Sequence, residues 1–442
     1  MSGILIRDAE LGGHRTDVRI APGLISEIGD RLVRDGEEVV EASGGELLPG
    51  LCDHHLHLHA LAAAERSVVC GPPGVTDPRQ LGAALAGARA DEHGWVRGVG
   101  YSEDVAGALD ATALDRLYAA RPVRIQHRSG ALWMLNSAGI AALRLGDHSG
   151  RILRGDDWLR ERLPPTRPPR LDRVGRMLAG FGITQVTDAT PDLDDTAIDA
   201  ISADMRSGAL PQRVHLLGVP LDRQKVDGPT VGPYKIVLAD SGLPDFDELV
   251  ERISMAHNVN RAVAVHCVTR EALALLIAAL DRTGTRKGDR IEHAALLPRE
   301  LVPHIRRIGL AVVTQPGFLA DRGDDYLRDV PAIDQPDLYR ARSLIDGGVP
   351  CALSSDAPYG PVDPWVVMRA AVERLTAAQK TISKEERLTR EQALAGYLAP
   401  PDDPGGRPRE IAVGAPADLV LRTKDGVVVE TIVGGVRLGQ TA

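Results

Sequence analysis

The sequence has few cysteines, and their spacing excludes a fold built on disulfides. The four are widely separated and form no CxxC pair: Cys52, Cys70, Cys267 and Cys351. A small secreted scaffold needs a denser and paired framework, so this chain is not of that class. The four thiols are therefore expected to be free, as is usual in a reducing cytoplasm.

An excess of positive charge is missing as well. The 442 residues include 52 lysines and arginines against 61 aspartates and glutamates, which gives a formal net charge of -9. No basic stripe is present that would neutralise a phosphate backbone, so we expect no nucleic-acid partner. The sequence favours a small-molecule substrate instead.

Long apolar runs are also absent from the sequence. No stretch approaches the ~20 residues needed to cross a bilayer, because charge, Gly or Pro interrupts each candidate. The N-terminal segment soon turns acidic at Asp8, and it shows neither the apolar core nor the small-residue cleavage site of a secretion signal. We therefore expect a cytoplasmic protein with no membrane partner.

The composition is that of a globular enzyme, with 43% hydrophobic and 26% charged residues. At 442 residues the chain exceeds the usual size of one domain, so a large domain with a smaller one attached is expected. Short alternating segments in residues 3–47 return in residues 417–433 around Gly and Asp turns, a pattern typical of small antiparallel strands. The sequence thus predicts a small β-sandwich domain built from both chain ends, residues 1–47 and 404–442.

Between the two ends, short apolar runs alternate with helix-like stretches, which is the pattern of parallel βα units. The predicted strands cover residues 47–57, 182–189, 213–219, 234–240, 262–267, 290–294, 310–315 and 351–356. Because these are eight, we expect a (β/α)8 TIM barrel over residues 48–403. The long gap after the first strand predicts an insertion over residues 60–178 that carries its own secondary structure.

The first predicted strand ends in two alternate histidines, His55 and His57. Side chains alternate along a strand, so both imidazoles project to the same face and are placed to grip one metal ion. Active sites of such barrels lie at the C-terminal ends of the strands, where this pair stands. The motif alone leaves two interpretations open, a metal site or two ordinary polar side chains.

Later strands also end in residue types that bind metals. His266 closes the fifth predicted strand, His293 the sixth and Asp356 the eighth. These positions point into the active site of a barrel. Lys235 stands on the fourth strand, where a charged amine left unpaired in the interior would be costly. Together these residues favour the metal interpretation of the histidine pair.

The motifs around these residues resemble the amidohydrolase superfamily, most closely the branch that includes formamide deformylases. In chain order they are "PGLCDHHLH", "YKIVLAD", "VAVHC", "IEHAAL", "VVTQPGF", "LSSDAPYGPVDPW" and "VGAPADLVL". Each motif is weak alone, but their order and spacing over nearly the whole chain make the set specific. The resemblance implies an enzyme that hydrolyses a carbon–nitrogen bond, other than a peptide bond, in a small molecule.

The resemblance also implies a ligand set for divalent metal. The residues it assigns are His55, His57, Lys235, His266, His293 and Asp356. The pair on the first strand and Asp356 would bind the more buried ion, and the two later histidines a second one. Lys235 would bridge both as a carbamate, which forms from the amine and carbon dioxide and offers two anionic oxygens. Zinc is preferred because the set is rich in histidine, and the number of ions, one or two, stays open.

The same resemblance implies a mechanism. Two ions ~3.5–4 Å apart would hold a bridging hydroxide and lower the pKa of its parent water toward ~7. The metal-activated hydroxide would attack the substrate carbonyl. Asp356 would act as general acid/base, taking the proton and passing it to the leaving nitrogen.

Two other functions compete with amide hydrolysis. A mononuclear-metal deaminase of a heterocycle usually carries a glutamate three residues after the histidine of the fifth strand, where this chain has Thr269, and the next acid is Glu271. This difference favours hydrolysis, although another acid would also serve a deaminase. A non-catalytic barrel scaffold is the alternative of another class, and it is disfavoured because such relatives lose metal ligands.

Substrate contacts are expected from an insertion segment that resembles the family's substrate-facing loop. It contains His127, Arg128 and Trp133, and the histidine that the family often carries before the asparagine corresponds to Ala131 here. Trp133 would either cover the site or serve as ordinary packing.

Three further candidates come from the barrel. Arg270, like Arg128, would hold a substrate carboxylate, and surface salt bridging is an equally good account of either arginine. Gln315 and Tyr359 are expected to line the mouth. The sequence leaves the substrate and the oligomeric state open, with a homo-oligomer as one alternative.

Overall fold

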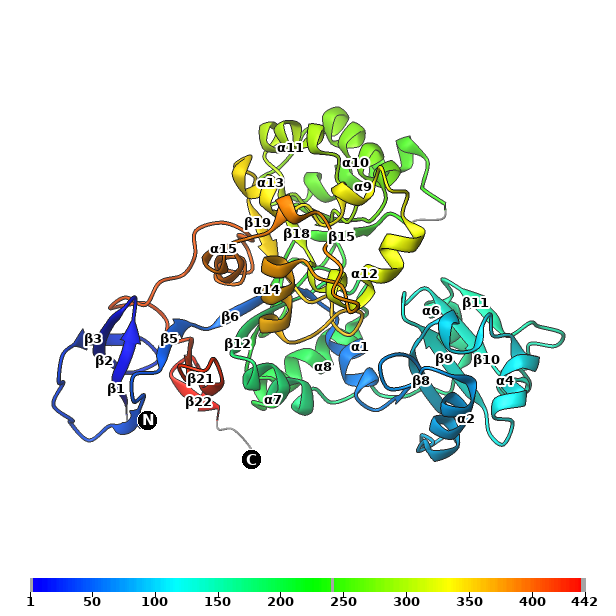
Figure 1. The fold of residues 1–442 in the computed structure, drawn as a ribbon, viewed down its shortest axis with the longest axis horizontal. Coiled ribbons are helices and arrows are strands. Elements are labelled where there is room, and N and C mark those ends of the chain that lie inside the picture. Colours follow the sequence, from blue (N-terminus) through cyan, green and yellow to red (C-terminus); the bar gives the residue numbers. More distant parts are fainter. Residues whose placement is uncertain (1–2, 240–241, 439–442) are drawn as a thin grey trace. The chain divides into compact units, whose positions relative to one another are not determined.

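The computed structural model describes residues 3–239 and 242–438, which fall into two compact units (Figure 1). The larger unit comprises Met1–Leu58 and Arg170–Ala442, and the smaller comprises His59–Pro169. Residues 1–2 and 439–442 of the expected small domain lie outside the described residues. So does Asp240, the last residue of the fourth predicted strand.

Eight parallel strands form the centre of the larger unit, and each lies inside one of the predicted ranges. They are β6 (Leu51–Leu56), β12 (Ile183–Asp188), β13 (Arg213–Leu216), β15 (Tyr234–Val237), β16 (Val263–Cys267), β17 (Arg290–His293), β18 (Ala311–Thr314) and β19 (Cys351–Leu353). They pair in two sheets, β14-β13-β12-β6 and β15-β16-β17-β18-β19, where β14 is Thr230–Val231. Most of their residues are buried, as strands covered on both faces require.

Backbone hydrogen bonds join the two sheets at both of their borders. The Lys235 N–H donates to the Leu217 carbonyl (3.1 Å), which links β15 to the segment after β13. The Asp356 N–H donates to the His55 carbonyl (2.8 Å), which links the loop after β19 to β6. The C-terminal ends of the first and last strands are therefore held side by side.

Arg261 stabilises the border between β13 and β15. Its buried guanidinium donates to the carbonyl oxygens of Val219 (2.6 Å), Pro220 (3.0 Å) and Gly232 (2.7 Å). Burial lowers the pKa of Arg261 to about 10, so the group remains charged near neutral pH. One side chain thus binds the chain on both sides of β14.

Replacing Arg261 by leucine is expected to lower the free energy of unfolding by about 2–3 kcal/mol, because buried carbonyl groups that lose their donor cost ~1–3 kcal/mol. Urea unfolding followed by circular dichroism measures the change. Arg282→Leu, at an exposed position of α10 (Arg270–Thr283), is the control and should change it by less than about 0.5 kcal/mol. An Arg261→Leu variant as stable as this control would show that the carbonyls do not depend on the guanidinium.

A sheet built from both chain ends belongs to the same unit. Its strands are β1 (Ile4–Leu11), β2 (His14–Ile20), β3 (Ile25–Gly29), β4 (Glu38–Glu41), β5 (Glu46–Pro49), β20 (Leu419–Arg422), β21 (Val428–Val433) and β22 (Val436–Leu438). Their order is β22-β21-β20-β5-β1-β2-β3, and β4 pairs with β1. Apolar side chains of both ends share one core, in which Ile6 and Val18 of the first strands pack with Leu419 and Ile432.

The first predicted barrel strand, residues 47–57, is broken in two at Gly50. β5 pairs with β20 of the terminal sheet, whereas β6 pairs with β12. A Cβ atom at position 50 would lie 2.2 Å from the Thr184 side chain, so the backbone passes where only glycine fits. A pattern of apolar residues does not register this break, and the prediction of one continuous strand was wrong here.

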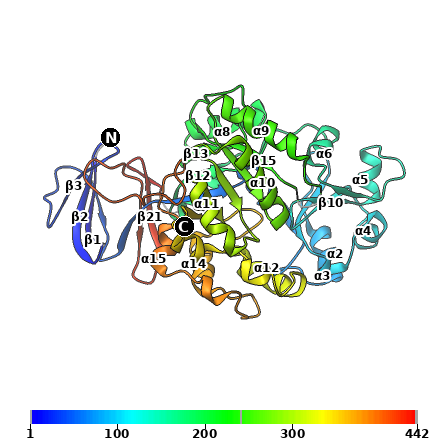
Figure 2. The same cartoon turned by 90° about the horizontal axis from the view of Figure 1, so that it is seen from above.

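Helices lie outside the parallel strands, as Figure 1 and Figure 2 show for α9 to α12 around β15. In this unit they are α7 (Asp172–Gly180), α8 (Asp195–Arg206), α9 (Phe246–Asn258), α10, α11 (Val302–Ile308), α12 (Gly317–Asp329), α13 (Ala341–Asp346), α14 (Pro364–Glu373) and α15 (Arg390–Ala395). In α10 the buried Leu273, Leu276, Ile277 and Leu280 recur at helical spacing and form the face that packs inward.

The smaller unit has its own sheet and core. Its strands are β7 (Val68–Val69), β8 (Val96–Tyr101), β9 (Val123–His127), β10 (Leu132–Leu135) and β11 (Arg151–Leu153), paired in the order β11-β10-β9-β8-β7. Its helices are α2 (Pro78–Gly87), α3 (Glu103–Ala106), α4 (Ala111–Leu117), α5 (Ser137–Ala142) and α6 (Asp156–Arg162), and α1 (Leu58–Ala64) precedes them. The insertion therefore carries regular secondary structure of its own.

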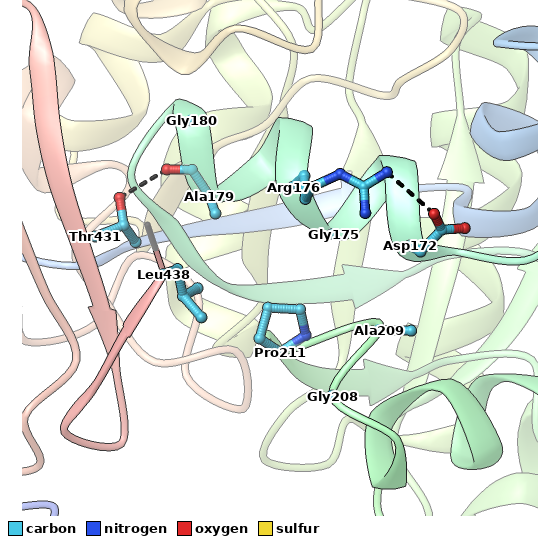
Figure 3. A pocket seen from close by; sticks show the side chains of 10 residues that line it. All are labelled: Asp172, Gly175, Arg176, Ala179, Gly180, Gly208, Ala209, Pro211, Thr431 and Leu438. Atoms are coloured by element: carbon cyan, nitrogen blue, oxygen red, sulfur yellow. Dashed lines mark hydrogen bonds and ion pairs between the residues drawn. The ribbon is translucent and has the colours of Figure 1, made fainter. Parts of the chain in front are cut away.

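A cavity of about 320 Å³ lies between α7, the turn before β13 and the terminal strands (Figure 3). Among its lining side chains, Arg176 pairs with Asp172 (3.0 Å), and the Thr431 hydroxyl donates to the Ala179 carbonyl (2.6 Å). The cavity borders the N-terminal ends of β12 and β13, whereas barrel active sites lie at the C-terminal ends. It is therefore separate from the candidate site.

Within residues 3–239 and 242–438, none of the helices combines the length and the hydrophobicity that crossing a bilayer demands.

Candidate metal centre

Three of the predicted ligands, His55, His57 and Asp356, converge at the C-terminal ends of β6 and β19. Asp356 Oδ1 lies 3.2 Å from His57 Nε2 and 3.6 Å from His55 Nε2. One ligand atom of each residue lies within 4.8 Å of those of the other two. Two imidazole nitrogens and a carboxylate oxygen at this spacing are a donor set that suits a divalent metal such as zinc.

The two later histidines extend this cluster. The ring centroid of His293 lies 4.7 Å from that of His55 and 4.3 Å from that of His266. His55 and His57 are 5.5 Å apart by the same measure. All four predicted histidine ligands therefore form one continuous group at the ends of β6, β16 and β17.

Backbone conformation contributes to this convergence. Asp356 and His293 both have positive φ angles, 56° and 73°. This left-handed region is unfavourable for residues with a side chain, and it occurs both in turns and at functional sites. At both positions the chain leaves the extended conformation just where a ligand must face the cluster.

Lys235 lies on β15, next to the β16 strand that carries His266, and is only 3% exposed. Its Nζ has no hydrogen-bond partner among the described residues. Burial lowers the pKa of this amine below its usual value, and Glu292 and Asp356 oppose that shift. A buried amine without a partner is costly as a cation, so burial favours its uncharged form.

Three of the four rings have an identified partner at Nδ1, which leaves Nε2 for another ligand. His57 Nδ1 lies 3.1 Å from the Thr190 hydroxyl, and His293 Nδ1 lies 2.8 Å from the Gln315 amide oxygen. His55 Nδ1 contacts the carboxylate of Glu292. Sequence reasoning missed Thr190 and Glu292, and the one signal in the sequence was the acidic residue directly before His293 in the strand Arg290–His293.

Burial sets the protonation of the central rings. It lowers the pKa values of His55 and His293 well below the usual range, and nearby Lys235 and His266 add to the effect. Both rings are therefore neutral at physiological pH, and each has a lone pair for a metal. Asp53 supports the strands, since its Oδ1 accepts from the N–H groups of His55 and Ser355 (3.2 Å each).

The barrel candidates for substrate contact differ in their surroundings. The Tyr359 ring lies 5.4 Å from the His57 ring, beside the cluster. Gln315 is fully buried, and its amide group serves His293 and the Ser354 hydroxyl (3.0 Å). Its polar atoms therefore orient the predicted metal ligand His293 from inside the protein. Arg270 pairs with Asp334 (2.8 Å) and Asp337, which accounts for its charge without a substrate.

The remaining candidates belong to the smaller unit. Trp133 is 6% exposed, packs in a core of that unit, and donates its indole N–H to Asp156 (2.8 Å). His127 contacts Glu103 (2.9 Å) and Ser129 (2.8 Å). The Arg128 N–H donates to the Tyr101 carbonyl (2.9 Å). The surroundings of Trp133 are those of ordinary packing.

Comparisons with known proteins identify the family to which the chain belongs. The model of the amidohydrolase family matches residues 38–439. The chain is 24% identical over 408 residues to YtcJ of Bacillus subtilis (strain 168), a protein named as an amidohydrolase, with 78% of this chain and 76% of that protein covered. It is 30% identical over 142 residues to the N-substituted formamide deformylase of Arthrobacter pascens, with 31% of this chain and 26% of the relative covered.

A solved structure extends the comparison to the fold. The crystal structure of an uncharacterized metal-dependent hydrolase from Pyrococcus horikoshii OT3 has a TM-score of 0.76 at 20% identity, with 96% of this chain and 98% of that chain covered. The fold is thus an α/β fold of TIM-barrel type. The chain belongs to the amidohydrolase family and is a hydrolase of carbon–nitrogen bonds, which confirms the predicted resemblance and enzyme class.

Proposed function

We propose that this protein is a metal-dependent amidohydrolase that cleaves an amide, N-acyl or cyclic amide bond of a small molecule. The observation that carries the proposal is the convergence of His55, His57 and Asp356. Zinc is the preferred metal because imidazole and carboxylate ligands suit it. The cleaved bond is inferred from the family, together with the name of the formamide deformylase relative.

The residues present fit a metal. Lys235 Nζ and Asp356 Oδ1 are buried and lack hydrogen bonds within the described part of the chain, and Nε2 of His55 and of His57 lie 3.6 and 3.2 Å from that carboxylate oxygen. His55, His57 and Asp356 would hold one ion, and His266 and His293 a second, with Lys235 between them as a carbamate. A bound divalent ion acts as a Lewis acid on a substrate carbonyl and makes water acidic enough to supply a nucleophile at neutral pH.

Asp356 is the proposed general acid/base. Its carboxylate lies at the open end of the strands, and its Oδ1 is free of hydrogen bonds to the described residues. This oxygen would take a proton from the attacking water and give it to the leaving nitrogen. The same carboxylate would hold the ion, so ligation also fixes its position during proton transfer.

The structure around position 269 favours hydrolysis over deamination. Thr269 caps α10, since its side chain accepts the Ala272 N–H (3.2 Å). Glu271 is exposed in the first turn of that helix. Neither residue supplies the buried carboxylate that a deaminase needs beside the ring of His266 to move protons.

Metal analysis tests the proposal. Protein purified with zinc and bicarbonate, and without chelator, is expected to retain about one or two zinc ions per chain. Chelation should abolish hydrolysis, and added zinc should restore it. A screen of N-formyl and N-acyl amines, acylated amino acids, cyclic amides and amino-heterocycles would identify the bond. Ammonia release without a carboxylic product would contradict amide hydrolysis, and protein that binds no metal would contradict the whole proposal.

The acidic net charge and the lack of long apolar runs bear on where the enzyme works and on its partners. We propose that it works in the cytoplasm on a small molecule, without nucleic-acid or membrane partners. A homo-oligomer is compatible with this function, and light scattering of the purified protein would measure it.

A further inference from the structure

A buried carboxylate beside the metal centre has no role in the function proposed so far. Glu292 is fully buried on β17, and its Oε2 contacts His55 Nδ1. Its Oε1 accepts from Arg290 Nε (2.5 Å). Both carboxylate oxygens are engaged by these neighbours, so Glu292 is not available as a ligand itself.

The contact determines which nitrogen of His55 carries the hydrogen. The Glu292 carboxylate is paired with the Arg290 guanidinium and acts as a hydrogen-bond acceptor, so the hydrogen in its contact with His55 is on Nδ1. The lone pair is then on Nε2, the atom that faces Asp356 at 3.6 Å.

The partner of His55 differs in charge from those of the other rings. His57 has the Thr190 hydroxyl at Nδ1, and His293 has the Gln315 amide oxygen, both of which are neutral. A carboxylate attracts the ring hydrogen more strongly than a neutral acceptor and increases the electron density at the opposite nitrogen. Among the three rings with an identified partner, His55 is therefore expected to donate its electron pair to a metal ion most strongly.

Arg290 makes this arrangement tolerable inside the protein. It is buried with Glu292, and its Nη2 also donates to the His54 carbonyl (3.4 Å) on β6. A lone carboxylate at this depth would be costly, whereas a paired one is offset by the guanidinium. The arginine also fixes the direction of the carboxylate, because it binds one oxygen and leaves the other toward His55.

We propose that Glu292, held by Arg290, is a positioning residue of the metal centre that fixes the orientation of His55 and strengthens its bond to the metal. This inference rests on the proposed metal-dependent function. The inference adds a condition to that function: His55 and His57 bind the metal tightly only when the buried pair of Glu292 and Arg290 is present. Loss of such a partner typically weakens metal binding ~10–100-fold.

Glu292→Gln is the direct test. The amide oxygen can accept from either His55 or Arg290, and the amide nitrogen then opposes the other donor. The dissociation constant for zinc, measured by competition with a chromophoric chelator, is expected to rise about 10–100-fold. The visible d–d absorption of the cobalt-loaded protein should shift, because it reports the donor strength and geometry of the ligands.

Glu386→Gln is the matched control. Glu386 is also buried and paired with an arginine, since its Oε1 accepts from Arg340 Nη1 (2.7 Å). The same substitution of glutamate by glutamine is thus made at a buried carboxylate that accepts from Arg340 and from the Ser343 N–H and contacts no histidine of the cluster. Its zinc affinity and cobalt spectrum should equal those of the wild type, whatever the loss in thermal stability.

The outcomes separate this inference from the function on which it rests. Wild-type protein that binds no zinc would overturn the proposed function and the inference together. Wild-type binding with an unchanged affinity in Glu292→Gln would overturn the inference alone. If that variant does not fold, a double variant with Arg290→Met and Glu292→Leu removes both charges, and such apolar replacement is usually tolerated. Weaker zinc binding in the double variant supports the inference, and wild-type affinity overturns it.

Discussion

Replacing Asp356 by asparagine is expected to lower kcat by at least about 10³-fold, because general acid/base catalysis alone contributes ~10²–10⁴-fold. Asparagine keeps the size of the side chain and one oxygen. It cannot accept a proton from water and pass it on, and it brings no negative charge to the metal. The measurement is kcat with a substrate from the screen, expressed per bound zinc ion so that metal loss is counted separately.

Asp337→Asn is the control for this substitution. Asp337 is 9% exposed and Asp356 is 7% exposed, so the two sites are similarly buried. The Asp337 carboxylate binds Arg270 and Arg340, away from the histidine cluster. This variant should lose stability but keep kcat near that of the wild type. An Asp356→Asn protein that binds zinc and keeps kcat within about tenfold would show that another group moves the proton.

The strand-end ligands could be predicted from the sequence because their placement depends on local periodicity. His55 and His57 alternate on one strand, and Asp356 follows an apolar run that ends where a barrel opens. Parallel pairing then carries residues far apart in the chain to one end of the sheet. This rule brings the three residues to the same end of the sheet, and the left-handed conformation of Asp356 in the loop after β19 completes their convergence.

Glu292 could not be found in this way. It neighbours His293 on β17, and strict alternation would place the two side chains on opposite faces. Both nevertheless reach His55, because the positive φ of His293 turns the chain at the end of the strand. The contact joins residues 237 positions apart. A single sequence does not record such a departure from the regular strand.

Sequence reasoning missed the contacts that support the other rings for a related reason. Gln315 follows its strand as a residue at the mouth would, yet its amide turns to His293 and Ser354 within the fold. Thr190 is one of many polar residues in loops, and only the register of β12 with β6 brings it to His57. The periodicity of apolar residues predicts which strand carries a side chain. The hydrogen-bond partner of that side chain depends on its rotamer and on the register of the strands.

Lys235→Ala is expected to lower kcat/KM by at least about 10²-fold and to reduce the zinc content toward one ion per chain. The wild-type Nζ is buried and has no hydrogen bond in the described residues, which is the setting that a carbamate would resolve. Alanine removes the amine to which carbon dioxide adds. A short carboxylate such as acetate or propionate offers the same two oxygens, so adding it should restore part of the activity.

The controls distinguish a bridging group from a lysine that only fills space. Acetamide has nearly the shape of acetate but no negative charge, so it should not rescue Lys235→Ala. Lys380→Ala, at an exposed lysine, should behave as the wild type with and without added carboxylate. ¹³C NMR of wild-type protein prepared in labelled bicarbonate should show a carbamate signal that the Lys235→Ala variant lacks. Without that signal and without rescue, Lys235 is a plain amine beside a single ion, and the centre works with one metal.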